Sequence, residues 1–149
     1  MREVCPGLFL SCWPEAVAAV SIHGGWSAID PPFFVVNCTR DLPMLSEHGL
    51  RLAVDDDGRD GSVEALAGML PTVVAEMHAR LAAGERVLVH CRAGQQRSPA
   101  VAAAYLMHAR GVGAAAAMGA VSAKKPDAFF FRANFRGALE LFEATRRGP

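Results

Sequence analysis

Short apolar runs separated by polar and glycine-containing segments dominate the chain up to residue 90. They cover residues 7–14, Phe33–Asn37, Leu50–Val54 and Val87–His90. Apolar runs of this length, bounded by turn residues and rich in β-branched side chains, are typical of buried strands. Between the first two runs, Ala16–Val20 is expected to begin a small helix. Residues 23–32, with two glycines and two prolines, are expected to form a loop.

A helical period marks four segments, the first of them between the last two of these runs and the other three after residue 90. The first runs from Ser62, a plausible N-cap, to about Gly84, and Pro71 within it predicts a kink or a division into two helices. Its apolar positions recur at the spacing of one helix face: Leu66, Met69, Leu70, Val73, Val74, Met77 and Leu81. Three more helices are predicted over residues 99–110, 112–123 and 131–146. We therefore predict one compact α/β domain, residues 1–149, with a central sheet of four or five strands flanked by helices.

Composition narrows the class of protein further. The chain has 149 residues, of which 52% are hydrophobic and 20% charged, which predicts a packed globule. Fifteen basic residues balance fifteen acidic ones, so bulk charge gives no reason to expect binding to nucleic acid or to an anionic membrane. No apolar run is long enough to span a bilayer, and the first 15 residues do not resemble a secretory signal.

The four cysteines, at positions 5, 12, 38 and 91, lack the spacing of a metal site. Free thiols are therefore expected, which suits a reducing compartment, the cytoplasm or also the nucleus.

The segment Val87–Ala100, with the sequence VLVHCRAGQQRSPA, carries the chemistry. A predicted strand delivers Cys91 to its carboxyl end, and a helix begins close to Arg97. In an α/β sheet this is the edge where ligands bind, and a helix N-terminus with the backbone N–H groups of a short loop forms a cradle for an anion. Arg97 can grip two phosphate oxygens with its planar fork. We expect the phosphate-binding loop to comprise Arg92, Ala93, Gly94, Gln95, Gln96 and Arg97.

The same positive field favours the ionised form of the Cys91 sulfur, which makes it a candidate nucleophile for phosphoryl transfer. The hydroxyl of Ser98 can donate to that sulfur when the thiolate departs from phosphorus. His90 is expected to support the loop by hydrogen bonding rather than to act as a base, because a thiolate needs none.

These residues resemble a known family. The pattern His90-Cys91-x5-Arg97-Ser98 is similar to the active-site loop of the cysteine-dependent protein tyrosine phosphatases. The segments Gly7–Leu10, Val35–Thr39 and Ser98–Met107 resemble the dual-specificity subfamily in particular. The positions of Phe135, Leu139 and Phe142 are similar to those of its last helix. The resemblance implies this fold, no metal or organic cofactor, and a phosphorylated protein substrate carrying phosphotyrosine or phosphoserine/threonine.

Phosphate ester cleavage also needs an acid to protonate the leaving oxygen. The acidic stretch that follows the predicted strand Leu50–Val54 supplies candidates. Resemblance to the family pattern puts Asp56 in the place of the general acid; Asp55 and Asp57 stay open as rivals, and Asp60 is a weaker one. A solvated acidic turn explains at least some of these carboxylates.

The chain departs from the family in its phosphate loop. Gln96 stands where serine is common, and Gln95 is polar where an apolar residue is frequent. Both amides are expected at the mouth of the pocket, where they would alter substrate preference. A clear match to the family's "P-N-x-x-F" pattern before Phe135 is lacking.

Two other functions stay open. One is a phosphatase for a phosphoinositide, an RNA 5′-phosphate or a glucan, which the extra charge of Arg92 would favour. The other is an inactive phosphate-binding module. The sequence leaves the oligomeric state undetermined, along with any redox partnership of Cys38 with Cys91.

Overall fold

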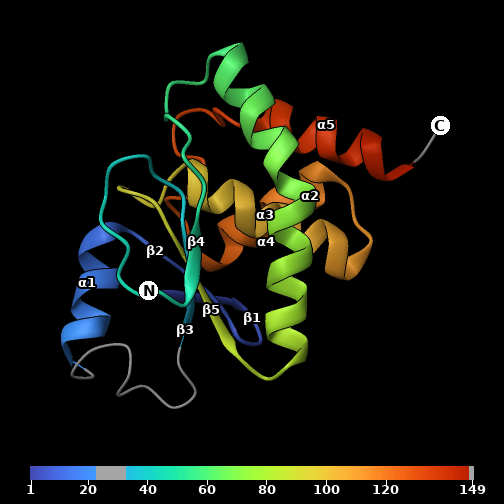
Figure 1. The fold of residues 1–149 in the computed structure, drawn as a ribbon. Coiled ribbons are helices and arrows are strands. Elements are labelled where there is room, and N and C mark those ends of the chain that lie inside the picture. Colours follow the sequence, from blue (N-terminus) through green and yellow to red (C-terminus); the bar gives the residue numbers. More distant parts are fainter. Residues whose placement is uncertain (23–32, 148–149) are drawn as a thin grey trace.

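The computed structural model describes residues 1–22 and 33–147 (Figure 1), so the loop expected over residues 23–32 lies outside it. Within these residues the chain forms five strands and five helices. In chain order they are β1 (Arg2–Cys5), β2 (Leu8–Ser11), α1 (Trp13–Ile22), β3 (Phe33–Asn37), β4 (Gly49–Arg51), α2 (Asp60–Ala82), β5 (Arg86–His90), α3 (Arg97–Arg110), α4 (Ala114–Lys124) and α5 (Arg136–Arg147).

One sheet holds all five strands in the order β1-β2-β5-β3-β4. Strand β1 is antiparallel to β2, and the other pairs are parallel. Ser11 of β2 and Asn37 of β3 both lie opposite His90 of the central strand β5. These three parallel strands therefore end level with one another, and the loops that follow them meet at one edge of the sheet.

Alternating side chains on the strands pack into two separate cores. Val87 and Val89 of β5 face the larger core, whereas Leu88 faces a smaller one with Phe33 and Val35 of β3. Helix α1 covers the smaller core, and helices α2 to α5 gather on the other face of the sheet (Figure 1). Because both faces are covered, the central strands are apolar at nearly every position, which explains their strong signal in the sequence.

Helix α3 is the central helix of the larger layer. Every residue from its first, Arg97, to Met107 is buried. The alanines at 100 and 102–104 are fully buried and let the sheet and the neighbouring helices approach closely. The helix that follows the candidate phosphate loop is thus held firmly in the core.

The α/β class and the five-stranded sheet confirm the predicted fold, and several boundaries differ. Strand β1 was not predicted, and β4 ends at Arg51, so most of Leu50–Val54 is not strand. Helix α2 begins at Asp60 after Arg59, so Ser62 is not its N-cap, and the helix is not divided at Pro71. Pro71 lies on the exposed side of α2, while the buried residues on its other side hold the helix together.

The last helix begins at Arg136 rather than at 131. Phe129 and Phe131 have φ angles of 62° and 67°, in the left-handed region, which no α-helix admits. The preceding residues form an irregular segment that returns to the phosphate loop.

Candidate active site

The segment between β5 and α3 is shaped around one glycine. Gly94 has a φ angle of 72°, and a Cβ placed on it would lie 3.0 Å from the backbone nitrogen of Cys12. A side chain at this position would therefore be strained by conformation and by contact with the end of β2. The glycine lets the loop turn tightly above the carboxyl ends of β2 and β5.

The turn brings hydrogen-bond donors to the sulfur of Cys91, a residue only 2% exposed. The backbone N–H of Gly94 donates to Sγ at 3.2 Å, and the Ser98 hydroxyl lies 3.1 Å from the same atom. Ser98 is the second residue of α3, so the positive end of that helix also points toward this region. Donors and a helix N-terminus stabilise negative charge on a sulfur.

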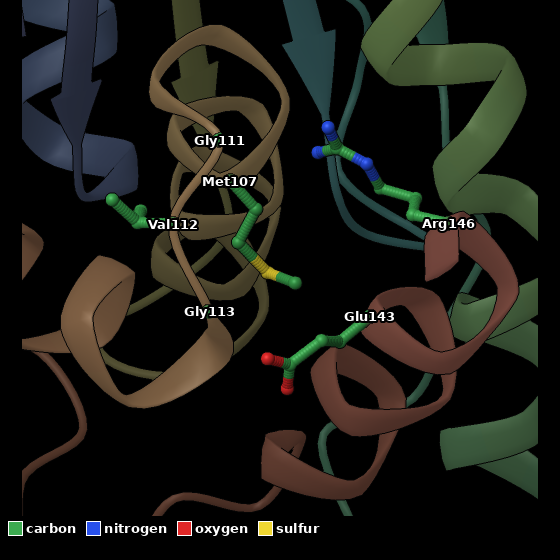
Figure 2. A pocket seen from close by; sticks show the side chains of 6 residues that line it. All are labelled: Met107, Gly111, Val112, Gly113, Glu143 and Arg146. Carbon is green, nitrogen blue, oxygen red and sulfur yellow. The ribbon is translucent and has the colours of Figure 1, made fainter.

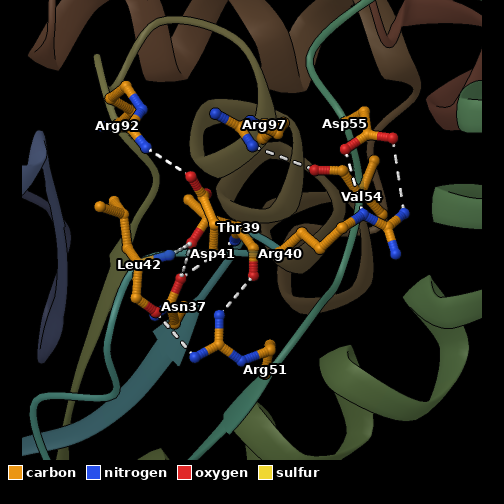
Figure 3. Close-up of polar contacts among 10 residues, drawn as sticks. All are labelled: Asn37, Thr39, Arg40, Asp41, Leu42, Arg51, Val54, Asp55, Arg92 and Arg97. Carbon is orange, nitrogen blue, oxygen red and sulfur yellow. Dashed lines mark hydrogen bonds and ion pairs between the residues drawn. The ribbon is translucent and has the colours of Figure 1, made fainter.

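Arg97 is anchored to the segment that precedes the acidic stretch. Its side chain is buried, and Nη1 donates to the carbonyl oxygen of Val54 at 3.0 Å (Figure 3). Its Nε is buried and has no hydrogen-bond partner in the part of the chain that the structure describes. A buried donor without a partner is costly. A bound anion could accept a hydrogen bond from the Nε of Arg97.

His90 lies buried under the loop. Its Nδ1 lies 3.2 Å from the carbonyl oxygen of Cys91, so Nδ1 carries the proton in this contact. Its ring packs 5.5 Å from that of Trp13, and burial lowers the pKa of the imidazole below its ordinary value. The neutral form is therefore favoured, which suits the predicted role of His90 in supporting the loop.

The three consecutive aspartates after Val54 have different partners. Asp55 forms an exposed ion pair with Arg40, with Oδ1 3.2 Å from Nε (Figure 3). Asp57 accepts the backbone N–H of Arg59 at 3.0 Å, and this bond, followed by one from Ser62, lowers the pKa of its carboxyl. Asp55 and Asp57 thus have local partners, and Asp60 is the first residue of α2.

Asp56 is connected to the phosphate loop through Asn134. The Asn134 side-chain amide donates to Asp56 Oδ1 at 3.0 Å. The backbone N–H of Asn134 donates to Oε1 of Gln96, also at 3.0 Å. Among the candidate acids, Asp56 is the one for which the structure gives a link to this loop. The geometry therefore favours Asp56 over its rivals.

The segment after β3 frames the opposite side of the loop. Asn37 accepts from the backbone N–H and the hydroxyl of Thr39, and its own amide donates to Leu42. Arg51 donates to the carbonyl oxygens of Thr39 and Leu42 (Figure 3). Asp41, in the same turn, forms an ion pair of 2.8 Å with Arg92, the residue after Cys91.

Of the two amides of the loop, Gln96 differs from the expectation. Gln96 is only 7% exposed, so it does not face the pocket mouth. Its side chain instead makes three hydrogen bonds to the segment 130–134. Its amide is long enough to reach these backbone groups, which the shorter serine common in the family is not. Gln95 is half-buried, and its carbonyl oxygen accepts the backbone N–H of Phe129.

All four cysteines are free thiols. Cys38 follows β3 and is fully buried; its backbone N–H donates to the carbonyl oxygen of His90 at 2.8 Å. Burial raises the pKa of the Cys38 thiol well above its ordinary value, and negative charge on Cys91 adds to that effect. Cys38 is therefore held in its neutral form beside the loop.

A hollow of about 230 Å³ lies away from this site, at the far end of α3. Met107, Gly111–Gly113, Glu143 and Arg146 line it (Figure 2). It is separated from Cys91 by the length of α3, so it forms no part of the phosphate loop.

Residues 1–22 and 33–147 contain neither a candidate metal site nor a helix suited to spanning a membrane. No group of three or more histidine, cysteine or acidic side chains there is placed to hold a metal ion. No helix in the same residues has the length and apolar character needed to cross a membrane.

Comparison with known proteins agrees with the geometry of the loop. The family described as dual specificity phosphatase, catalytic domain, matches residues 31–145. The chain belongs to the dual specificity phosphatase family. The predicted resemblance is thus confirmed, as is a cysteine-dependent phosphatase domain at the level of the family.

Individual relatives with similar sequences or structures are also named as dual specificity phosphatases. Human dual specificity phosphatase 28 is 40% identical over 127 residues, which span 83% of this chain and 67% of that protein. Dual specificity protein phosphatase Mpk3 of Drosophila melanogaster is 33% identical over 132 residues, 84% of this chain, but the match spans only 30% of that protein. The crystal structure of human DUSP28 superposes with a TM-score of 0.80 and 30% identity, covering 99% of this chain and 95% of that one.

The sequence reasoning missed Asn134. Its partner Asp56 lies 78 residues earlier in the chain, so spacing gave no signal for their contact. The incomplete family pattern before Phe135 did point to this region, without indicating what the asparagine binds. Arg51 was also missed, because spacing gave no signal for its contacts. It donates to the backbone of a turn that lies about ten residues earlier in the chain.

Proposed function

We propose that this chain hydrolyses phosphate monoesters on proteins, with Cys91 as the nucleophile. The observation that carries the proposal is the environment of the Cys91 sulfur. It is buried at the carboxyl end of the central strand, within hydrogen-bond distance of the Gly94 N–H and the Ser98 hydroxyl. A sulfur set among donors at a helix N-terminus is suited to attack a bound phosphoryl group.

The first half-reaction transfers the phosphoryl group to sulfur. The Cys91 thiolate attacks phosphorus, and a sulfur–phosphorus bond forms as the bond to the leaving oxygen breaks. Asp56, in its protonated form, gives its proton to that oxygen, so the product leaves as an alcohol or phenol. Arg97 and the loop N–H groups hold the equatorial oxygens and stabilise their spreading charge.

The second half-reaction returns the enzyme to its starting state. Asp56, now ionised, accepts a proton from water as the water oxygen attacks phosphorus. The sulfur–phosphorus bond breaks, inorganic phosphate is released, and the Ser98 hydroxyl donates to the departing thiolate. All bonds and protons are accounted for without a metal or an organic cofactor.

Proteins carrying phosphotyrosine and phosphoserine/threonine are the proposed substrates. Two exposed arginines near the loop are paired with carboxylates: Arg92 with Asp41, and Arg40 with Asp55. A phosphatase for polyanionic substrates such as phosphoinositides benefits from free cations in and around the loop, whereas Gln95 and Gln96 are neutral. This balance favours a phosphoprotein over the alternative substrates.

Turnover of p-nitrophenyl phosphate by the parent and by Cys91→Ser tests the chemistry. We expect the parent to release phosphate and the variant to lose at least about a thousandfold in kcat, because the weaker serine nucleophile lacks the ionised sulfur. Ser98→Ala is the matched control, since it keeps the nucleophile and should retain part of the activity. Equal rates for the parent and Cys91→Ser would contradict the nucleophile, and an inactive parent would favour a binding module.

Substrate class requires a second measurement. We expect higher kcat/KM on phosphotyrosine and phosphothreonine peptides than on a soluble phosphoinositide, a 5′-phosphorylated RNA or a phosphorylated glucan. The reverse order would overturn the protein substrate while leaving the chemistry in place.

A further inference from the structure

An exposed pair of aromatic side chains lies on the segment that returns to the phosphate loop. Phe130 is 52% exposed and Phe131 is 94% exposed, and their ring centroids are 4.3 Å apart. Large apolar side chains contribute to stability when they are buried, and Phe131 is almost entirely in water. Folding therefore gives no reason for an aromatic residue at position 131.

The backbone of this segment is strained as well. Phe129 and Phe131 are the non-glycine residues with positive φ in the part of the chain described. The left-handed conformation costs a bulky residue about 1–2 kcal/mol, so surrounding contacts must impose it. Strain of this kind tends to occur where a side chain is positioned for function.

The contacts that impose it come from the phosphate loop itself. The backbone N–H of Phe129 donates to the Gln95 carbonyl oxygen at 2.7 Å. The Gln96 amide donates to the carbonyl oxygens of Phe130 at 3.2 Å and Arg132 at 2.7 Å. These bonds fix the backbone that carries both aromatic rings to the two residues that precede Arg97.

We propose that Phe130 and Phe131 form an aromatic platform that binds an apolar side chain next to the phosphorylated residue of a protein substrate. This inference rests on the proposed function and adds a substrate preference to it. An aromatic surface on a segment that is hydrogen-bonded to the phosphate loop offers apolar contact area that no phosphate group uses. The platform therefore selects substrates by their neighbouring residues.

The exposure of Phe131 indicates which part of the substrate it contacts. A side chain that lined the pocket around the phosphorylated residue would be partly covered by the other walls. Phe131, at 94% exposed, stands clear of such walls. The flanking chain of the substrate, which lies outside the pocket, is thus its expected partner.

Matched phosphopeptides test the platform. The peptides differ only in having leucine or serine at each position beside the phosphorylated residue, and p-nitrophenyl phosphate serves as a substrate without flanking residues. For the parent we expect kcat/KM to be about five- to tenfold higher for the best leucine peptide than for its serine counterpart. Most of the difference should lie in KM, because the contact is equal in the ground and transition states.

Phe131→Asn removes the ring while keeping a residue that tolerates positive φ. We expect this variant to reduce the leucine preference to less than about twofold and Phe131→Trp to restore it. Leu141→Ala is the control, since Leu141 is a half-exposed apolar residue on α5, outside the platform. It should keep the preference of the parent.

Three results would separate the possible failures. A leucine preference unchanged in Phe131→Asn would overturn the platform. An equal loss of kcat/KM on leucine peptides, serine peptides and p-nitrophenyl phosphate would also overturn the platform, because such a loss indicates a disturbed phosphate loop. An inactive parent would instead overturn the proposed function. Binding of the same peptides to Cys91→Ser would then measure the leucine preference without catalysis.

Discussion

The phosphate loop and the segment 129–134 on its rim are built in different ways. The loop is a local structure, in which Gly94 and Ser98 both contact the Cys91 sulfur within eight residues of chain. The rim depends on partners far away in the sequence: Asn134 contacts Asp56, and Gln96 contacts Phe130 and Arg132. The first region is fixed by short turns and buried backbone, and the second by a backbone bond to Gln95 and by the side chains of Gln96 and Asn134.

The two regions should therefore tolerate substitution to different degrees. Changes in the loop affect the reacting atoms directly, because the anion would be held by the loop's own N–H groups and Arg97. Changes in the rim alter how well the acid and the substrate are positioned. Substitutions in the loop should accordingly cost more activity than substitutions in the rim.

After replacement of the nucleophile itself, Arg97→Lys should cost the most activity. Lysine keeps the charge but lacks the planar fork that grips two oxygens, and it would not reproduce the bond to Val54 in the same geometry. We expect kcat/KM on p-nitrophenyl phosphate to fall by about 10²- to 10³-fold. Arg92→Lys is the matched control, since Arg92 is exposed and paired with Asp41, and its loss should stay within about threefold. Comparable losses for both variants would remove the special role of Arg97.

Asp56→Asn should reduce turnover of substrates with poor leaving groups by about a hundredfold, the usual contribution of a general acid. A substrate with a good leaving group needs less protonation and should lose less. Asp55→Asn and Asp57→Asn provide the controls. If either neighbour lost more than Asp56→Asn, the acid would be reassigned to it, and the phosphatase chemistry would stand.

Gly94→Ala should lower the free energy of unfolding by about 2 kcal/mol, from positive φ combined with contact against Cys12. Gly84→Ala separates these causes, because Gly84 also has positive φ but has open space around it. Denaturant titration of both variants should show the larger loss at Gly94. An equal loss would mean that the close approach to β2 carries no cost.

Asn134→Ala should have a moderate effect, because it removes the bond to Asp56 and keeps the backbone bond to Gln96. One exposed hydrogen bond is worth about 1 kcal/mol, which corresponds to about a fivefold lower kcat/KM. In Asp56→Asn the same change should have little further effect, since the two residues act together. Additive losses in the double variant would show that Asn134 acts elsewhere.

The smallest effect concerns pH and stability. Burial lowers the pKa of His90, so between that value and about 6.5 the unfolded chain binds a proton that the folded chain does not. The contribution of His90 to the free energy of unfolding is therefore full above the unfolded pKa. It declines as the pH falls from the unfolded pKa to the folded one. His108 has a lowered pKa for a similar reason and contributes in the same direction. His90→Asn should weaken the dependence of the unfolding free energy on pH between pH 7 and 5. An unchanged dependence would mean that it comes from His108.

Prediction from sequence succeeded where signals are local. The strand Phe33–Asn37 and the turn of β5 into α3 were read correctly because a buried parallel strand is apolar at nearly every position. Strand β1 and the start of α5 were read wrongly. Strand β1 depends on its pairing with β2. The start of α5 depends on the irregular segment before it, which is held by bonds to Gln95 and Gln96.

The α/β class, the family and the group of residues around Cys91 could be read from the sequence, because the hydrophobic pattern and the motif residues lie close together along the chain. The folded structure was needed to show which aspartate is linked to the phosphate loop, where the Gln96 amide points, and that two phenylalanines lie exposed on its rim. Those outcomes depend on contacts between residues 34 to 78 positions apart, and linear spacing carries no record of such distances.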